Sequence, residues 1–231
     1  MKLRLRYAKR GKVRFTSHRD TARIWERAMR RAGVPVATSA GFTPRPRLSF
    51  GLALPTGAES VAEYLDAEVL DDAMTVDDLD DLPARLDPVL PAGFEVLLVA
   101  VPERGVGSLQ EAVTSVTWEL GTPPGWDLPA VVGDLLAADA LPIERERKGE
   151  RRVDDIRPAI LALTADDGTL VAEVATIGRG LRPAELAGAA FPGADVAALR
   201  ALRTHQWIEH DGDRREVLAL PGVVPAPLVG A

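Results

Sequence analysis

The sequence contains no cysteine among its 231 residues. This absence excludes disulfide bonds, iron–sulfur clusters and metal sites built on thiolates. His205 and His210 lie five residues apart without a carboxylate at ligand spacing, which makes a poor metal site. We therefore predict no metal and no cofactor for this chain, and any chemistry that needs a cysteine-held cluster must belong to another protein.

Long apolar runs and the common catalytic motifs are also missing. No stretch approaches the roughly 18 apolar residues of a membrane span, and the opening MKLRLRYAKRGK lacks the apolar core of a secretory signal. The sequence has no Walker loop, GxGxxG, GxSxG or HExxH motif. These absences favour a cytoplasmic protein and give no support to the common nucleotide-dependent, serine hydrolase or zinc protease classes.

Acidic residues are scarce in the first 50 positions. This segment has 14 Lys and Arg residues against only Asp20 and Glu26, a net charge of +12, whereas the rest of the chain carries −18. So uneven a distribution indicates a basic surface for an anionic partner at the N-terminal end. Because phosphate contacts dominate nucleic-acid affinity, RNA is the partner we expect.

Hydrophobic periodicity predicts an α+β fold. The first half reads as an opening pair of alternating strands at 3–7 and 13–15 joined by a tight turn, followed by a helix over 17–32. A Gly/Pro-rich loop over 39–51 then leads into a short strand, and after it come a strand at 63–69, a helix within 76–86 and a strand at 94–101. This βαββαβ order is that of the ferredoxin-like split βαβ unit. The second half reads similarly, with strands at 115–120, 143–147, 160–163 and 170–176 and helices at 129–139, 183–190 and 196–207.

We therefore predict two ferredoxin-like (split βαβ) domains in tandem. The first covers residues 1–104 and is basic, and the second covers 112–220 and has an extra C-terminal helix. Glycines and prolines between them, within 102–109, are typical of a linker. The Pro/Gly/Val-rich residues 221–231 are typical of a flexible tail.

The helix predicted over 17–32 is strongly amphipathic. Ser17 and Asp20 have the spacing of a capping box, and Gly33 is placed as the C-cap. At about 100° per residue the apolar residues gather on one side, which should place Trp25 in the core. The other side carries a ladder of arginines, namely Arg19, Arg23, Arg27, Arg30 and Arg31.

Two basic surfaces are candidates for binding nucleic acid, and the sequence leaves open which one does so. One is the sheet face away from the helices, and the other is the arginine ladder of the helix. Arg45 and Arg47 add charge to the loop over 39–51, where Phe42 can stack on a base. The predicted nucleic-acid-binding residues are Arg4, Arg6, Lys12, Arg14, Arg19, Arg23, Arg27, Phe42, Arg45 and Arg47.

His18 offers an alternative, catalytic interpretation. It follows the capping Ser17, and Tyr7 and Lys12 lie nearby in the predicted sheet. His18 and Tyr7 could act as general acid and base in metal-independent RNA cleavage. A histidine at a helix cap near arginines is more often a polar surface residue without a catalytic role.

A second charged stretch runs from Glu144 to Arg157 and mixes basic with acidic residues. Such mixing is typical of an ordered loop with internal ion pairs. Its candidate site residues are Arg152, Asp154 and Arg157. The sequence leaves open whether they grip a ligand or hold the loop in place.

Several stretches together resemble the radical SAM-linked protein family, a domain of unknown function found beside or fused to a radical SAM enzyme. The matching stretches are RYAKRGKVRF at 6–15, SHRD at 17–20, RRAGVP at 30–35, GFTPRPRLSFG at 41–51, EYLD at 63–66 and VDDIRP at 153–158. The resemblance implies a separately encoded radical SAM partner that carries the iron–sulfur cluster. The resemblance indicates no reaction for this chain itself.

These observations predict an RNA-binding accessory protein, acting on tRNA or rRNA with a radical SAM RNA- or protein-modifying partner, that is not itself an enzyme. One alternative is a metal-independent endoribonuclease, whose layout is similar to the RNA-processing RAMP proteins of CRISPR systems. The other is a docking module in which the basic face meets an acidic surface of the radical SAM partner.

Overall fold

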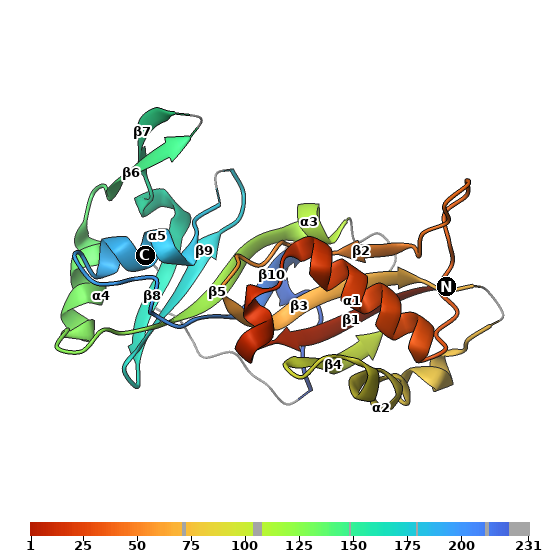
Figure 1. Cartoon of the computed structure of the whole chain (residues 1–231). Helices are drawn as coiled ribbons and strands as arrows, with labels where there is room; N and C mark the ends of the chain where they lie inside the picture. Colours follow the sequence, from red (N-terminus) through yellow and green to blue (C-terminus); the bar gives the residue numbers. More distant parts are fainter. Residues whose placement is uncertain (71–72, 104–107, 148, 179, 211–212, 222–231) are drawn as a thin grey trace. The chain divides into compact units, whose positions relative to one another are not determined.

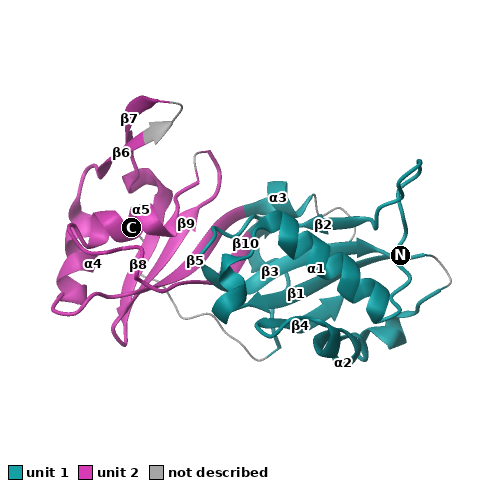
Figure 2. Ribbon diagram, in the orientation of Figure 1, with its two compact units in different colours: residues 1–113, 208–223 teal, residues 114–207, 224–231 magenta. Residues whose placement is uncertain are grey.

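The computed structural model describes residues 1–70, 73–103, 108–147, 149–178, 180–210 and 213–221 (Figure 1). The chain divides into two compact units (Figure 2). Unit 1 contains Met1–Val113 and the described residues from Ile208 onward, and unit 2 contains Thr114–Trp207. No helix in the described ranges is long and apolar enough to cross a membrane.

Unit 1 is built on an antiparallel sheet with one long helix. Its elements are β1 (Lys2–Lys9), the 3₁₀ helix η1 (Gly11–Phe15), α1 (His18–Arg31), β2 (Leu48–Phe50), β3 (Glu59–Glu68), η2 (Val76–Leu79), α2 (Leu82–Leu86), η3 (Asp87–Val89), β4 (Phe94–Ala100), α3 (Leu109–Ala112) and, late in the chain, β11 (Asp213–Glu216). The strand order is β4-β1-β3, and β2 pairs with β3.

Unit 2 combines an antiparallel sheet with a separate two-stranded ribbon. Its elements are β5 (Val113–Gly121), α4 (Leu128–Ala137), β6 (Pro142–Arg147), β7 (Glu150–Asp155), η4 (Arg157–Ala159), β8 (Ile160–Asp166), β9 (Thr169–Ala175), α5 (Pro183–Ala190) and β10 (Ala201–His210). The strand order is β10-β5-β9-β8, and β6 and β7 form a separate two-stranded sheet. The prediction of an α+β chain is confirmed in this form, as a mixed protein with mostly antiparallel strands and few helices.

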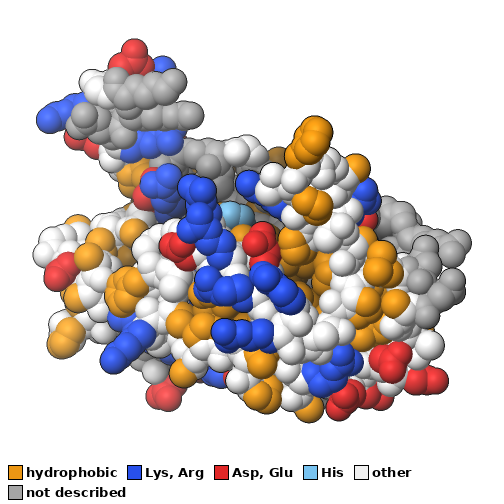
Figure 3. Space-filling view, turned by 45° about the vertical axis from the view of Figure 1, so that its right-hand side comes forward, with side chains coloured by type: hydrophobic (Ala, Val, Ile, Leu, Met, Phe, Trp, Pro, Cys, Tyr) orange, Lys and Arg blue, Asp and Glu red, His pale blue; other side chains and the backbone are white. Residues whose placement is uncertain are grey.

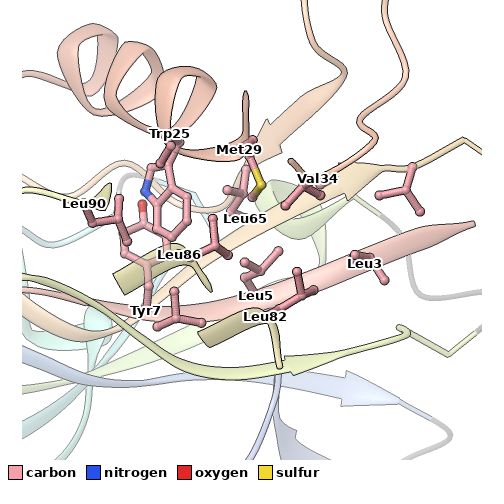
Figure 4. Close-up of a cluster of buried hydrophobic side chains, with 14 of the residues drawn as sticks. Leu3, Leu5, Tyr7, Trp25, Met29, Val34, Leu65, Leu82, Leu86 and Leu90 are labelled. Carbon is pink, nitrogen blue, oxygen red and sulfur yellow. The ribbon is translucent and has the colours of Figure 1, made fainter. Parts of the chain in front are cut away.

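The core of unit 1 lies between β1, β3 and the helices α1 and α2 (Figure 4). Leu3, Leu5 and Tyr7 alternate along β1 and point to this side, as period-2 side chains of a strand must. Trp25 of α1 is fully buried, and its ring centroid lies 4.8 Å from that of Tyr7. The predicted core position of Trp25 is confirmed.

α1 begins and ends close to the predicted residues. The Ser17 hydroxyl accepts a hydrogen bond from the Asp20 N–H at 3.1 Å and donates to the Asp20 carboxylate at 2.7 Å. The helix ends at Arg31, and Gly33 follows with φ +67, a left-handed conformation that glycine adopts without steric cost. The five ladder arginines are all exposed, as the amphipathic pattern predicts.

The second face of β1 corrects one of the two predicted basic surfaces. Arg4 and Arg6 are almost fully buried, not exposed. Arg4 makes a two-pronged ion pair with Asp66 at 2.7 and 2.9 Å, and Arg6 pairs with Glu216 at 2.7 Å. Arg6 also donates to the carbonyl oxygen of Leu218 at 2.9 Å, so the segment that contains β11 covers this face. The prediction that Arg4 and Arg6 bind phosphate from an exposed sheet face is therefore wrong.

Burial changes the chemistry of the groups around Arg6. The pKa of Glu216 is raised because the carboxylate has lost water, although the Arg6 guanidinium opposes this change. Burial also raises the pKa of Tyr64, whose hydroxyl lies 3.4 Å from Glu216, far above its ordinary range. Tyr64 is therefore a neutral hydrogen-bond donor at physiological pH.

Three predicted elements differ in the structure. Residues 13–15 belong to η1 instead of a strand, because the chain turns at Gly11 (φ +67) and Val13 accepts the Thr16 N–H. The helix predicted within 76–86 is the short α2, and η2 precedes it; Pro83 at the start of α2 cannot supply an N–H to an earlier turn.

The helix predicted over 196–207 is instead the strand β10. Arg203 and Gln206 are buried there, and the Arg203 guanidinium lies 5.6 Å from the centre of the Trp118 ring. Because polar residues occupy buried positions on this strand, its sequence hides the alternation that normally identifies a strand. Part of the predicted linker (104–107) and most of the predicted tail (222–231) lie outside the described residues.

Gly93 is a position that only glycine should tolerate. Its φ is +102, and a Cβ there would collide with the Arg10 carbonyl oxygen and approach Val13 Cγ2 to 2.8 Å. We expect Gly93→Ala to lower the free energy of unfolding by about 1–3 kcal/mol. Gly188→Ala in α5 is the control, because its Cβ would enter open space; it should stabilise by roughly 0.5–1 kcal/mol. Urea denaturation measures the free energy of unfolding of both variants. Changes of equal sign and size would contradict the prediction that Gly93 is required for its conformation.

The Arg6–Glu216 pair should be essential for stability. Glu216→Ala leaves the buried Arg6 guanidinium without its carboxylate, which should cost about 3–5 kcal/mol. The matched control is Glu103→Ala. It removes the exposed carboxylate that pairs with Arg215, the residue before Glu216 in β11, and should cost under about 1 kcal/mol of unfolding free energy. Urea unfolding midpoints compare the two, and a small effect for both would show that water reaches Arg6.

Candidate anion-binding groove

A groove of about 630 Å³ lies between α1 and the chain that follows it; we name it the α1 groove. Half of its lining comes from one side of the helix and half from residues after the helix. The lining residues are Arg19, Ala22, Arg23, Glu26, Met29, Arg30, Val34, Val36, Thr38, Pro44, Arg45 and Pro46. On α1 these positions are three or four residues apart, which is why they share one side.

The wall opposite α1 is a short hairpin arm over 37–47. At its base the Ala37 N–H donates to Glu68 of β3 at 2.7 Å, and the Arg47 N–H donates to Ala37 at 2.8 Å. Further out, the Ser39 N–H donates to the Arg45 carbonyl oxygen, and the Ser39 hydroxyl accepts from the Arg45 N–H at 3.1 Å. These bonds hold the arm closed and keep Arg45 on the groove.

The α1 groove is strongly positive. The described part of the chain lines it with four arginines and one acid, Glu26. Among the described residues, none makes a hydrogen bond or ion pair with the side chains of Arg19, Arg30 or Arg45. Arg23 has only a loose ion pair, with Asp20 at 3.7 Å, and both side chains are more than half exposed. Such guanidinium groups are available to an anion from solution.

Figure 3 shows Lys and Arg side chains gathered on one face of the molecule, with few acidic side chains among them. The arrangement in the α1 groove suits phosphate, because a guanidinium can donate two parallel hydrogen bonds to its oxygens. The groove also has apolar lining from Ala22, Met29, Val34 and Val36. A phosphate attached to an apolar or aromatic group therefore matches it better than an inorganic ion.

The other predicted binding residues do not line this groove. Lys12 is exposed on η1. Arg14 lies over the Phe15 ring at 4.5 Å and donates to the Gly11 carbonyl oxygen at 3.3 Å. Arg27 is exposed on α1, one step around the helix from the groove, and Arg47 pairs with Glu68 at 2.8 Å. The structure thus brings together Arg19, Arg23 and Arg45 from the predicted set.

Phe42 lies in the outer part of the hairpin arm and is fully exposed. Its ring is two residues along the chain from the groove residue Pro44, and an exposed aromatic ring can stack on a base. The structure therefore keeps Phe42 among the candidate residues.

His18 and Tyr7 line the same small cavity, but its volume of about 10 Å³ has room for only about one water molecule. His18 is exposed at the first turn of α1, with its ring 5.4 Å from that of Phe50. Tyr7 is almost fully buried against Trp25. This burial removes Tyr7 as a group that could touch an RNA substrate.

The charged stretch of unit 2 forms the ribbon β6–β7 and the turn after it. In the ribbon, Arg145 Nε lies 2.6 Å from Asp154 Oδ2, and Arg152 pairs with Glu150 at 3.0 Å. The predicted Arg152 and Asp154 therefore both have partners inside the ribbon. The mixed charges act across and along the ribbon, as they do in an exposed pair of strands.

Arg157 lies at the C-terminal end of α4. Its guanidinium donates to the carbonyl oxygens of Leu136 at 3.0 Å and Ala138 at 3.2 Å. A cation there satisfies carbonyl groups that the helix leaves without partners. Beside it, Asp155 accepts the N–H groups of Leu141 and Arg157, and these bonds lower the pKa of Asp155.

Sequence reasoning omitted Arg30 and Glu26 from the site. Both carry a signal that could have placed them there: Arg30 lies seven residues after Arg23 and Glu26 seven after Arg19, so the four side chains share one stripe of the helix. The groove itself could not be predicted, because it depends on the arm folding back toward α1.

No curated protein matches this chain. Residues 2–183 match DUF2344, described as an uncharacterized protein family conserved in bacteria. This match spans more than half of the sequence and includes the whole α1 groove. The chain therefore belongs to the DUF2344 family.

Proposed function

We propose that this protein binds RNA through the α1 groove and the adjoining arm, and that it is an accessory protein, not an enzyme. The observation that supports this most is the set of arginines in one groove, three of which have no partner among the described residues. Phosphates of an RNA backbone supply the missing anions. Phe42 supplies an aromatic ring for stacking on an unpaired base.

The proposal includes a radical SAM partner that modifies RNA, with tRNA or rRNA as the substrate, or that modifies protein. Its support is the resemblance of the stretches at 6–15, 17–20, 30–35, 41–51, 63–66 and 153–158 to the radical SAM-linked family. A chain without cysteine would depend on such a partner for the cluster. In this arrangement the present protein holds the RNA in the cytoplasm while the partner carries out the reaction.

We also propose that each unit is a variant of the ferredoxin-like fold, with domains near the predicted 1–104 and 112–220 except for the segment from Ile208 onward, which belongs to unit 1. The strand orders β4-β1-β3-β2 and β10-β5-β9-β8 support this, because each follows the order of a split βαβ unit. In unit 2 the ribbon β6–β7 is then an insertion between α4 and β8.

Two other functions account for fewer of the observations. A metal-independent endoribonuclease would rely on His18 alone, because Tyr7 is buried; it requires RNA cleavage in EDTA that is lost in His18→Ala. A docking module for the radical SAM partner would use the same basic face, and its complex should survive nuclease treatment.

RNA binding should depend on salt and on the groove arginines. Phosphate contacts release counterions, so the affinity for bulk tRNA should fall steeply as salt rises. Arg23→Ala/Arg30→Ala should weaken binding about tenfold or more at low salt and reduce the log–log salt slope by roughly 0.7–0.9 per lost contact. Fluorescence anisotropy across a salt series measures both.

The matched control is Arg151→Ala/Arg152→Ala on the ribbon β6–β7. This variant also removes two exposed positive charges, but from unit 2. It should leave the log–log salt slope of RNA binding unchanged. Equal losses in the two double variants would mean that net charge alone attracts the RNA. No binding by the wild type at low salt would reject RNA as the partner.

A further inference from the structure

Of the residues that the structure describes, Glu26 is the one acid that lines the α1 groove. It is half-buried on α1, one turn from Arg23 and one turn from Arg30. Among the described residues, no hydrogen bond or ion pair involves its side chain. Its carboxylate oxygens are therefore free acceptors on the lining of an otherwise positive groove.

A carboxylate in this place weakens a site meant for phosphate alone, since like charges repel. It strengthens a site for a ligand that has both a phosphate and N–H donors. The dimensions agree with such a ligand, because about 630 Å³ falls within the range of small-molecule sites and is larger than inorganic phosphate needs.

The four RNA bases differ in what they offer to a carboxylate. Guanine has two adjacent donors, N1–H and N2–H₂, on its Watson–Crick edge, so it can donate to both carboxylate oxygens at once. Adenine and cytosine place an acceptor nitrogen beside their amino group, and uracil has a single N–H between two carbonyl groups. A charge-assisted pair of hydrogen bonds therefore distinguishes guanine from the other three.

We propose that the α1 groove holds one unpaired guanine nucleotide, with Glu26 accepting from N1–H and N2–H₂ and the groove arginines binding the phosphate. The apolar lining that reaches the surface, Ala22 and Val36, would contact the base. The nucleotide is either a guanosine of an RNA loop or free GMP. This inference deepens the proposed RNA binding and rests on it for the RNA source.

The test uses four hairpin RNAs with one stem and one variable loop nucleotide, titrated by fluorescence anisotropy at a single salt concentration. The wild type should bind the guanine loop about tenfold or more tightly than the other three, as expected for one good bidentate contact. Glu26→Gln should reduce this preference to about twofold, because an amide has one acceptor oxygen and its NH₂ faces a donor.

The control variant is Asp134→Asn, which removes one negative charge from an exposed helical position in unit 2. It should keep the preference for guanine. Competition by GMP and AMP separates the two sources: GMP, but not AMP, should displace the guanine loop.

The outcomes separate this inference from the proposed function. Salt-dependent binding with equal affinity for all four loops would keep the RNA-binding proposal and overturn the guanine site. Glu26-dependent binding of GMP without binding of any RNA would support the guanine site and reject the RNA source. Failure of RNA and GMP to bind would overturn both.

Discussion

The ion pair between Arg6 and Glu216 joins two parts of the sequence more than 200 residues apart in a place that water barely reaches. Arg6 lies in the middle of β1, and Glu216 lies at the end of β11. An isolated buried charge is very costly, so neither residue is stable there without the other. The pair therefore holds the late segment of the chain on the sheet of unit 1 and gives β1 two buried faces.

This covering of β1 decides which basic residues can meet a partner. The N-terminal segment has a net charge of +12, but Arg4, Arg6 and Lys9 are buried and neutralised or hydrogen-bonded within unit 1. The charge left in solvent is concentrated on α1 and the arm. α1 therefore combines two roles, since Trp25 and Met29 fix it on the core while its arginines line the groove.

Local sequence patterns predicted the structure correctly where apolar residues face the core and polar residues face water. The amphipathic pattern of α1, its Ser17 cap and Gly33 are visible in the sequence because one side of that helix meets water and the other meets the core. Prediction was wrong where polar residues are buried: Arg4 and Arg6 read as exposed, and Arg203 and Gln206 made β10 read as a helix. Their partners lie far away in the sequence, and no local pattern contains them. The groove has the same origin, because Arg45 reaches α1 only through a folded arm.

The hairpin arm is anchored at its base by main-chain hydrogen bonds to β3. Near its tip, the Phe42 side chain is as exposed to solvent as it would be in an extended peptide. Aromatic residues that stack on bases from the surface of a sheet are backed by protein and offer a single ring face. Both faces of the Phe42 ring are open to solvent. The arm can therefore act as a wedge, with its ring between two successive bases, in the way that apolar side chains separate base steps and bend nucleic acids.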